Sequence, residues 1–304
     1  AWKVKFKRGR FNSVAQQLKH NWQSAHNNQP LNRLFAELNL TLQPCLFSLS
    51  DMAEGLNSLD YKGFSQLSSE LFNSMGVSAL IHGDWQAKTA FELHQLIRDS
   101  ASGRLTASPP QLQPKRLEPH THIHRTVEQA TGDNAVLVYF QGDNDSAEQQ
   151  ITWMLAQQLL NASLFDELRT QRQLGYVVGS QYFPVRRLPG FMVFVQSPTH
   201  NTSALQEHIH TVLHDKIEQL DNVLTLQRWK HAKQTLSEQL TINDRSLRAR
   251  SQRFWGAIQM AETHFDRNVE MSAALERLQL SDWISEVKRL VIKQPRKIVL
   301  LSCQ

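Results

Sequence analysis

The sequence has few of the residues that build a cross-linked or membrane-embedded protein. Its two cysteines, Cys45 and Cys303, lie far apart in the chain. They can therefore form neither a disulfide framework nor a cysteine-type zinc site. Apolar runs are short, and none approaches the roughly 18 residues that a membrane-spanning helix needs. These absences exclude a disulfide-stabilised miniprotein and predict a chain with no membrane-embedded segment.

Catalytic signatures are also scarce. The sequence contains no G-x-S-x-G elbow, no Walker loop and no G-x-G-x-x-G turn, so three common enzyme classes lack support. Neither H-E-x-x-H nor its inverse, H-x-x-E-H, occurs among the 13 histidines. Any metal or nucleophile chemistry would therefore need a less familiar arrangement of residues.

What the sequence does have is the composition of a globular protein. It has 304 residues, of which 40% are hydrophobic and 20% charged, which is enough for about two domains. The ordinary glycine and proline counts exclude collagen-like and fully disordered chains. The chain begins at Ala1, and its first residues already alternate like a strand. We therefore expect it to be cut from a longer protein.

The net charge of +5 raises the question of nucleic-acid binding. Much of the excess is concentrated at the start of the chain, in Lys3, Lys5, Lys7, Arg8 and Arg10. Apolar residues at the positions between the lysines predict an amphipathic strand with one basic face. This face is either a solvated sheet edge or a contact with a missing partner. Because no RNP1, zinc-finger or basic-zipper pattern accompanies the charge, we expect no nucleic-acid binding.

Two groups of histidines have spacings that metal ligands can use. His120, His122 and His124 would project from one face of an extended segment. His210 and His214 would share one face of a helix, but no glutamate lies between them to act as a base. Each group is either a metal site or a polar, solvated surface, and the sequence favours the polar surface. We therefore predict no metal site in this chain.

The first third of the chain contains helical and strand-like patterns and ends in a linker. Apolar residues of the 64–75 segment predict a helix that Gly76 stops. A short strand over 77–81 and a helix from Gln86 to Arg98 should follow. The stretch from 100 to 119 is rich in proline and serine and has little periodicity, which indicates a domain boundary.

The rest of the chain alternates strands and helices. A buried strand over 135–140 precedes a helix that a capping box of Asp145 and Glu148 should open. A second helix should pass through Phe165 and Leu168 and stop near Gly175. The remaining predicted elements are strands at 176–183, 191–196 and 297–302, and helices at 205–220, 223–240, 245–261, 269–279 and 281–291. This order predicts an α+β fold, with helices packed on one face of a largely antiparallel sheet.

One stretch, Phe165 to Tyr176, places two hydrogen-bond donors at a helix-to-strand corner. Arg169 falls on the last turns of the helix, and Tyr176 starts the next strand. A guanidinium and a phenol supply donors but no nucleophile or base, which suits the binding of a substrate carbonyl or a developing oxyanion. The alternative is a helix-capping arginine and a core tyrosine.

The order of residues in this stretch carries a family resemblance. F-D-E-L-R-T-Q-R-Q-L-G-Y closely resembles the F-x-x-L-R-T-x-x-Q-L-G-Y motif in the C-terminal half of the pitrilysin and insulin-degrading enzyme family. These are the M16 zinc peptidases with an inverted H-x-x-E-H motif. Weaker similarities occur at 80–84, 191–197, 253–256 and 265–267, so the resemblance spans about residues 64 to 290.

The resemblance implies a fold of LuxS/MPP-like M16 domain repeats, in which four similar α+β domains form two halves that close into a chamber around peptides. Residues 1–100 would be the C-terminal part of the third domain. Residues 101–125 would be the linker, and 126–304 the fourth, C-terminal domain. The zinc ligands and the base glutamate of the family belong to its first domain. The zinc of the full-length enzyme would therefore be bound by a missing N-terminal catalytic half.

The resemblance also assigns roles within this chain. Arg169 and Tyr176 would bind the peptide substrate, and Tyr176 would be the catalytic oxyanion donor that completes the site of the other half. The chain alone would be inactive. The alternative is a stand-alone, metal-free subunit of the same fold that binds peptides or partners. The resemblance favours a periplasmic location, with the cytoplasm as the alternative.

Overall fold

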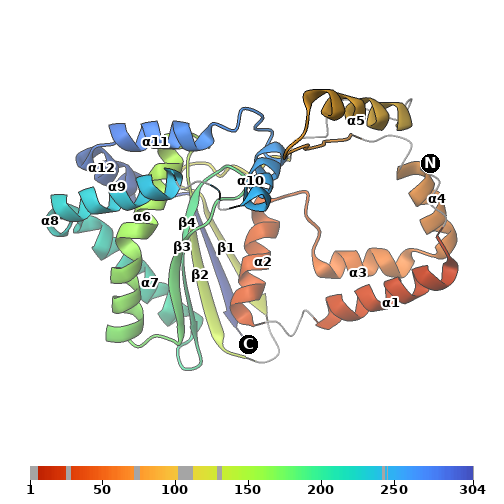
Figure 1. Cartoon of the computed structure of the whole chain (residues 1–304). Coiled ribbons are helices and arrows are strands. Elements are labelled where there is room, and N and C mark those ends of the chain that lie inside the picture. Colours follow the sequence, from red (N-terminus) through yellow and green to blue (C-terminus); the bar gives the residue numbers. More distant parts are fainter. Residues whose placement is uncertain are drawn as a thin grey trace. The chain divides into compact units, whose positions relative to one another are not determined.

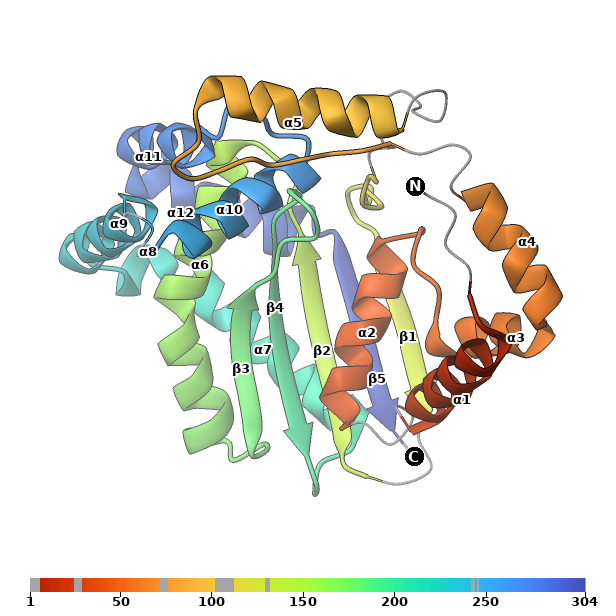
Figure 2. The same ribbon diagram turned by 45° about the vertical axis from the view of Figure 1, so that its right-hand side comes forward.

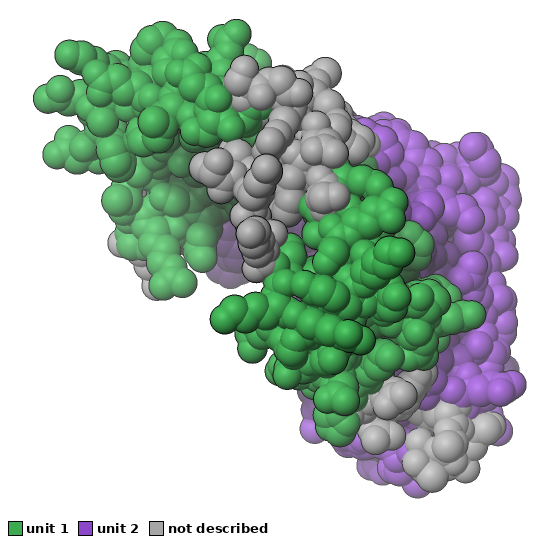
Figure 3. Space-filling model, turned by 90° about the vertical axis from the view of Figure 1, so that its right-hand side faces the viewer, with its two compact units in different colours: residues 1–27, 47–112, 243–265 green, residues 28–46, 113–242, 266–304 purple. Residues whose placement is uncertain are grey.

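The computed structural model describes residues 6–24, 29–71, 76–101, 112–128, 132–241, 244 and 246–303. The chain forms two compact units, and neither is continuous in sequence. Unit 1 contains residues 1–27, 47–112 and 243–265, and unit 2 contains 28–46, 113–242 and 266–304. Figure 3 colours the two units separately. The expected division into a partial third domain, a linker and a fourth domain stays a prediction.

A five-stranded sheet forms the centre of unit 2. Its strands are β1 (His122–Glu128), β2 (Asn134–Gln141), β3 (Val177–Tyr182), β4 (Gly190–Ser197) and β5 (Lys297–Cys303). Their order across the sheet is β1-β5-β2-β4-β3. Only β1 and β5 run parallel to each other, and the other neighbours are antiparallel. The predicted α+β class with a largely antiparallel sheet is confirmed.

Most helices of unit 2 cover one face of this sheet (Figure 1). They are α6 (Ala147–Phe165), η2 (Asp166–Gln171), α7 (Thr202–Glu218), α8 (Leu220–Val223), α9 (Leu226–Thr241), α11 (Arg267–Arg277), α12 (Leu280–Lys288) and η3 (Arg289–Lys293). The main core lies between them and alternate residues of the strands, among them Val136, Val138 and Val193. Trp153 of α6 and Trp283 of α12 are fully buried there.

Helix α2 (Pro30–Leu42) covers the opposite face of the sheet. Leu31, Leu34, Leu38 and Leu42 recur at helical spacing along one side of α2, and all are buried. They pack against the strand residues that alternate with those of the main core and face the opposite side of the sheet: Ala135, Leu137, Tyr139, Met192, Ile298 and Leu300. Figure 2 shows α2 in front of the sheet and α7 behind it. The expectation of helices on one face only is therefore wrong, because an N-terminal segment closes the second face.

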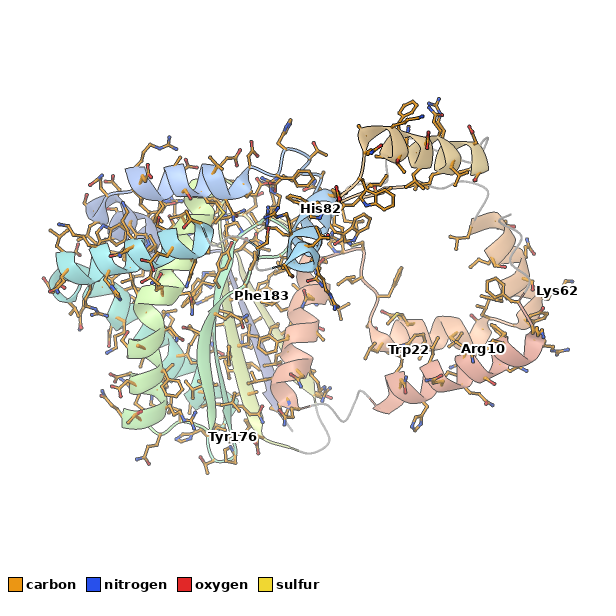
Figure 4. All side chains as sticks on the ribbon, viewed as in Figure 1. Arg10, Trp22, Lys62, His82, Tyr176 and Phe183 are labelled. Carbon is orange, nitrogen blue, oxygen red and sulfur yellow. The ribbon has the colours of Figure 1, made fainter. Side chains whose placement is uncertain are left out.

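The described residues of unit 1 form helices and no strand. The helices are α1 (Arg8–Ser24), α3 (Leu49–Ser58), α4 (Tyr61–Leu71), α5 (Ala87–Ser100) and α10 (Leu247–Gln259). Helix α1 packs against α3 and α4, and the rings of Phe11 and Phe64 stack with centroids 5.0 Å apart. Arg10 and Trp22 on α1 and Lys62 on α4 are labelled in Figure 4.

Several local predictions for unit 1 need correction. Arg8 and Arg10 belong to helix α1 and not to a basic strand, while residues 1–5 lie outside the described residues. Residues 77–81 form no strand, and among the described residues of unit 1 there is no strand with which they could pair. Helix α5 confirms the helix predicted from Gln86 to Arg98. Met75 lies outside the described residues, as do residues 102–111 of the expected linker.

Two predictions at the ends of α6 also change. Its N-cap is Ser146, whose side chain accepts a hydrogen bond from the backbone N–H of Gln149, and not Asp145. At the other end, α6 passes without a break into the π-helix η2. The predicted second helix is therefore a continuation of the first. Across the described residues, no helix is both long and apolar enough to cross a membrane.

Candidate functional site

The corner between η2 and β3 is built by residues with clear structural tasks. Leu168 and Leu174 are 0% and 1% exposed, which anchors both sides of the corner in the core. Between them, Gln173 adopts a positive φ of 52°, and the N–H of Leu174 donates to the carbonyl oxygen of Leu168 over 3.0 Å. The left-handed residue that ends this helix is thus Gln173 and not Gly175.

Gly175 has a different task, which is to let two strands approach closely. A Cβ atom at this position would lie 2.1 Å from the carbonyl oxygen of Gln196 on β4. No side chain fits into that distance, so only glycine allows the chain to enter β3 at this point. The position of Tyr176 at the start of the strand depends on this contact.

Tyr176 lies at one end of the sheet, where it is labelled in Figure 4, and is 50% exposed. Its phenol Oη donates to Oδ2 of Asp133 over 2.5 Å. The side-chain Nε2 of Gln196 donates to the same phenol oxygen over 2.5 Å and to Asp133 Oδ2 over 3.2 Å. Three side chains from three segments therefore form one hydrogen-bonded group around the phenol.

The electrostatics of this group favour the neutral phenol. The hydrogen bond to the Asp133 carboxylate raises the pKa of Tyr176 above its ordinary value, because a phenolate beside that carboxylate would be repelled. Gln196 is only 2% exposed, and its Oε1 has no hydrogen-bond partner among the described residues. Its amide is therefore held by burial and by the two hydrogen bonds that Nε2 donates, and the phenol stays a hydrogen-bond donor at neutral pH.

Arg169 lies on the exposed side of η2. Its guanidinium carbon sits 5.2 Å from the centroid of the Phe165 ring, one helical turn earlier. In the part of the chain that the structure describes, no hydrogen bond joins Arg169 to Tyr176 or to a helix cap. Arg169 and Tyr176 are thus two separately held donors near one corner, and the tyrosine is not a core residue.

The sequence analysis missed Asp133 as a partner of Tyr176 and did not give Gln196 this role. Asp133 lies just before β2, 43 residues from Tyr176 along the chain. The pairing registers explain the contact, because Gln196 lies opposite Ala135 of β2 and Val177 of β3. Only the strand order places these residues together, and no local motif signals it.

The histidine groups lie at β1 and on α7. His120 is in the turn before β1 with a positive φ of 63°, so the expectation that His120, His122 and His124 share one extended segment is wrong. His122 and His124 lie on the exposed side of β1, and His124 contacts Oε1 of Gln206 on α7 at 3.2 Å. The rings of His210 and His214 stack on α7 with centroids 6.1 Å apart. Among the described residues, no group of three or more histidine, cysteine, aspartate or glutamate side chains could hold a metal ion.

A histidine and a serine also meet in unit 1 without forming a catalytic pair. His82 Nδ1, on the residue labelled in Figure 4, lies 2.8 Å from Ser251 Oγ. The serine hydroxyl donates its proton to the carbonyl oxygen of Leu247 over 2.9 Å, so the histidine donates to the serine. In this arrangement the hydroxyl proton points away from His82, and the contact joins two segments of unit 1.

Comparison with known proteins shows what this chain is similar to. The family model for the PQQ synthase PqqF-like C-terminal lobe domain 4 matches residues 154–255, which include the corner. Human insulin-degrading enzyme is 22% identical over 281 residues, covering 88% of this chain and 27% of the human protein. Coenzyme PQQ synthesis protein F of Pseudomonas syringae is 34% identical over 84 residues, covering 28% of this chain and 11% of that protein. This chain is a relative of the M16 peptidases.

Solved structures of M16 proteins share the fold. Pitrilysin superposes with a TM-score of 0.84 at 15% identity, over 99% of this chain and 32% of pitrilysin. The peptidase M16 inactive domain from Pseudomonas fluorescens gives 0.68 at 15% identity, over 99% and 71%. The periplasmic protease PqqL from Escherichia coli gives 0.63 at 13% identity, over 98% and 33%. At these identities the structures show the fold alone.

The relatives that this chain matches are much longer than the chain itself. The chain spans about a quarter of the length of the insulin-degrading enzymes it matches, 27% for the human protein. The family model that matches is that of a C-terminal lobe. The chain is thus similar to a C-terminal segment of these longer proteins.

Proposed function

We propose that this chain is the non-catalytic C-terminal portion of a zinc metalloendopeptidase that degrades peptides in a closed chamber. The observation that carries the proposal is the corner at η2 and β3, where Tyr176 and Arg169 are both exposed. Their side chains donate hydrogen bonds and neither is a nucleophile. Such a corner suits the binding of peptide carbonyls beside a catalytic centre that lies elsewhere.

Tyr176 would act as the oxyanion donor. Its pKa lies above the ordinary tyrosine value of 10.0, so the phenol carries its proton at neutral pH and can donate to an oxygen on which negative charge develops. In the free chain this proton points to Asp133. Binding of substrate would turn the O–H away from Asp133 and toward the peptide, while Gln196 continues to donate to Oη.

Arg169 would orient the peptide. Its aliphatic stem and guanidinium rest against Phe165, which restricts the side chain without using its five N–H donors. These donors can bind a backbone carbonyl of an extended peptide. Arg169 and Tyr176 would thus hold two points of one substrate.

Zinc would not be bound by this chain. The described residues offer no set of three metal-ligating side chains, so they do not fit the metal that the family uses. In the proposed enzyme, the zinc site therefore belongs to an N-terminal half, which is the main partner of this chain.

The composition of unit 1 supports such a partner. Of its described residues, only Ala101 is among the buried hydrophobic residues, whereas Phe47, Leu71 and Phe91 are each at least 60% exposed. A unit with so little buried apolar surface cannot offset the entropy of folding by itself. We propose that the N-terminal half of the enzyme packs on the exposed apolar side chains of unit 1.

The decisive experiment reconstitutes the enzyme from two chains. The chain would be co-expressed with the N-terminal half encoded with it, and hydrolysis of a fluorogenic peptide would be measured. Tyr176→Phe removes only the hydroxyl and should lower kcat by more than tenfold, which is typical of losing an oxyanion donor. Arg169→Ala should mainly raise KM, because it removes a contact to the substrate in its ground state.

Matched controls separate these roles from general damage. Tyr61→Phe removes a phenol that donates to the carbonyl oxygen of Phe6 in unit 1, and Arg228→Ala removes an exposed arginine of α9. Both controls should keep the full rate. Unchanged rates in both Tyr176→Phe and Arg169→Ala would refute the catalytic role of the corner.

A second function has one observation in its favour. An M16 structure titled as an inactive domain has the same fold over 99% of this chain, and the described residues here lack a metal site. The alternative is therefore a stand-alone, metal-free subunit that binds peptides or partners. Tight peptide binding by the isolated chain, with no cleavage after the other half is added, would favour it.

The location we propose is the periplasm. The support is the structural neighbour PqqL, which is titled a periplasmic protease. Fractionation of cells that express the full-length protein would test this. Recovery in the cytoplasm would overturn it.

A further inference from the structure

A cavity of about 300 Å³ lies in unit 2 between helix α7 and strands β5 and β2. Residues of η3 also line it. Ser203, Gln206, Glu207, His210 and His214 line it from α7. Lys297 at the start of β5 lines the sheet side. The cavity contains none of the residues of the η2–β3 corner.

The polar side of this cavity has more basic than acidic side chains, with one lysine and two histidines against one glutamate. Lys297 is half-buried, and no ion pair joins it to a carboxylate among the described residues. Burial lowers the pKa of Lys297, and no neighbouring charge offsets that effect. The pKa of His210 is lowered by burial and by Lys297 and His214. Histidine and lysine therefore repel one another here, and only Glu207 on the rim is acidic.

The other side of the cavity is apolar. It is formed by seven hydrophobic residues from four elements: Val138 and Phe140 of β2, Val299 of β5, Ile209 and Leu213 of α7, and Val291 and Ile292 of η3. A phosphate ion needs donors on all sides, and this wall offers none. An anionic group attached to a hydrocarbon body meets both sides, because its charge faces Lys297 and its body faces the valines and Phe140.

We propose that this cavity binds a small monocarboxylate with an aliphatic or aromatic body. The carboxylate lies between Lys297 Nζ and the imidazole of His210, with Ser203 and Gln206 as further hydrogen-bond donors. A free carboxylic acid and the C-terminal carboxylate of a short peptide share this chemistry. The second negative charge of a dicarboxylate would be repelled by Glu207.

The test is an NMR titration of the full chain, observing the ring protons of His210 and His214. Hexanoate represents the free acid, N-acetyl-leucine the C-terminus of a peptide, and hexanamide the uncharged isostere. Hexanoate or N-acetyl-leucine should bind at least tenfold more tightly than hexanamide. Whichever of the two acids binds more tightly identifies the source of the ligand. Equal affinity for hexanoate, N-acetyl-leucine and hexanamide would overturn the proposal.

Inorganic phosphate and pH provide independent readouts. Phosphate lacks the apolar body and should bind more weakly than hexanoate; tighter binding of phosphate would contradict the proposal. Lowering the pH from 8 to 6 should increase the affinity for hexanoate, because protonation of His210 and the nearby His122 adds positive charge around Lys297. The pKa of each of these two histidines is lowered, mainly by burial, so most of the increase should come at the acidic end of this range. Glu207 is the acidic side chain of the cavity lining and comes from the same helix as His210. Affinity that does not change with pH would exclude the histidines from the site.

Variants locate the site. Lys297→Gln should weaken hexanoate binding at least tenfold, whereas Lys293→Gln, which removes an exposed lysine of η3 outside the cavity lining, should leave it unchanged. His210→Gln gives a second variant in case Lys297→Gln disturbs β5, and it should reduce the increase in affinity at pH 6, because only His122 then adds charge near Lys297. Full affinity in folded His210→Gln and Lys297→Gln would refute the site.

Discussion

The phenol oxygen of Tyr176 lies 2.5 Å from the carboxylate Oδ2 of Asp133. The two residues precede β3 and β2, and β4 runs between these strands. Gln196 on β4 pairs with Ala135 near the start of β2 and with Val177 at the start of β3. Strand order and register therefore bring an acid, an amide and a phenol to one end of the sheet.

The contact predicts a measurable effect on the ionisation of Tyr176. Asp133→Asn removes the negative charge and should lower the pKa of the phenol toward the ordinary tyrosine value of 10.0. NMR of tyrosine selectively labelled with ¹³C at Cζ would measure the titration. The stabilisation from this contact is present below pH 10 and is lost as the pH rises through the folded-state pKa, because the folded state holds the proton more tightly.

The control for this change is a second carboxylate near the same corner. Asp166→Asn removes the negative charge of a carboxylate that accepts a hydrogen bond from Gln171 and that makes no hydrogen bond to the phenol. It should leave the Tyr176 titration in place. An Asp133→Asn variant with the wild-type titration would show that the carboxylate does not control the phenol.

The sequence could predict only part of this site. Arg169 and Tyr176 follow from a local motif, because η2 and the start of β3 are adjacent in the chain. Asp133 cannot be predicted in the same way, since its contact depends on β4 lying between β2 and β3. Such strand orders come from long-range pairing, which short sequence patterns do not encode.

Glycine at position 175 is required by the close approach to β4. Gly175→Ala would place a Cβ atom 2.1 Å from the carbonyl oxygen of Gln196, so the strands must separate. We expect a loss of at least about 2 kcal/mol in the free energy of unfolding, measured by urea denaturation. The hydrogen bonds of Tyr176 should also weaken.

A matched glycine shows the opposite effect. A Cβ at Gly256 in helix α10 meets nothing within 4 Å, and alanine favours helix by about 0.5–1 kcal/mol over glycine. Gly256→Ala should therefore be neutral or stabilising in the same assay. Equal losses in both variants would mean that the contact between Gly175 and Gln196 is not the cause.

The two faces of the sheet differ in how well the sequence predicts them. The face under α6 and α7 could be predicted, because those helices have apolar stripes and follow the strands closely. The cover of the second face comes from α2, about 90 residues before β1, and helical spacing alone does not say which sheet it covers. The run at 77–81 shows the reverse error, since a β-like composition forms no strand without a partner to pair with.

Leu38 tests whether α2 stabilises the C-terminal sheet. It is 0% exposed and packs in the cluster that contains Leu137 and Leu300. Leu38→Ala should lower the free energy of unfolding by about 2–5 kcal/mol, measured by urea denaturation with the tryptophan fluorescence of unit 2 as the signal. Leu67→Ala, at a position 59% exposed on α4, should change it by less than about 0.5 kcal/mol. Similar effects of the two variants would exclude α2 as a core element.

Glu286 on α12 predicts how the fold responds to acid. Its carboxylate accepts hydrogen bonds from Arg289 at 2.7 and 2.8 Å and from Gln149 of α6 at 2.5 Å. Arg289 is the main cause that lowers the pKa of Glu286 below its ordinary value of 4.5. The stabilisation is therefore fully present above pH 4.5 and is lost as the pH falls through the lower, folded-state pKa. Glu286→Gln should lower the free energy of unfolding at pH 7 by about 1–3 kcal/mol. It should also reduce the further decline of stability below pH 4.5, which urea denaturation at several pH values would measure.

The control is an exposed carboxylate on the same helix. Asp282→Asn should keep the decline of the wild type. The same steep decline in Glu286→Gln would show that other carboxylates control the acid response.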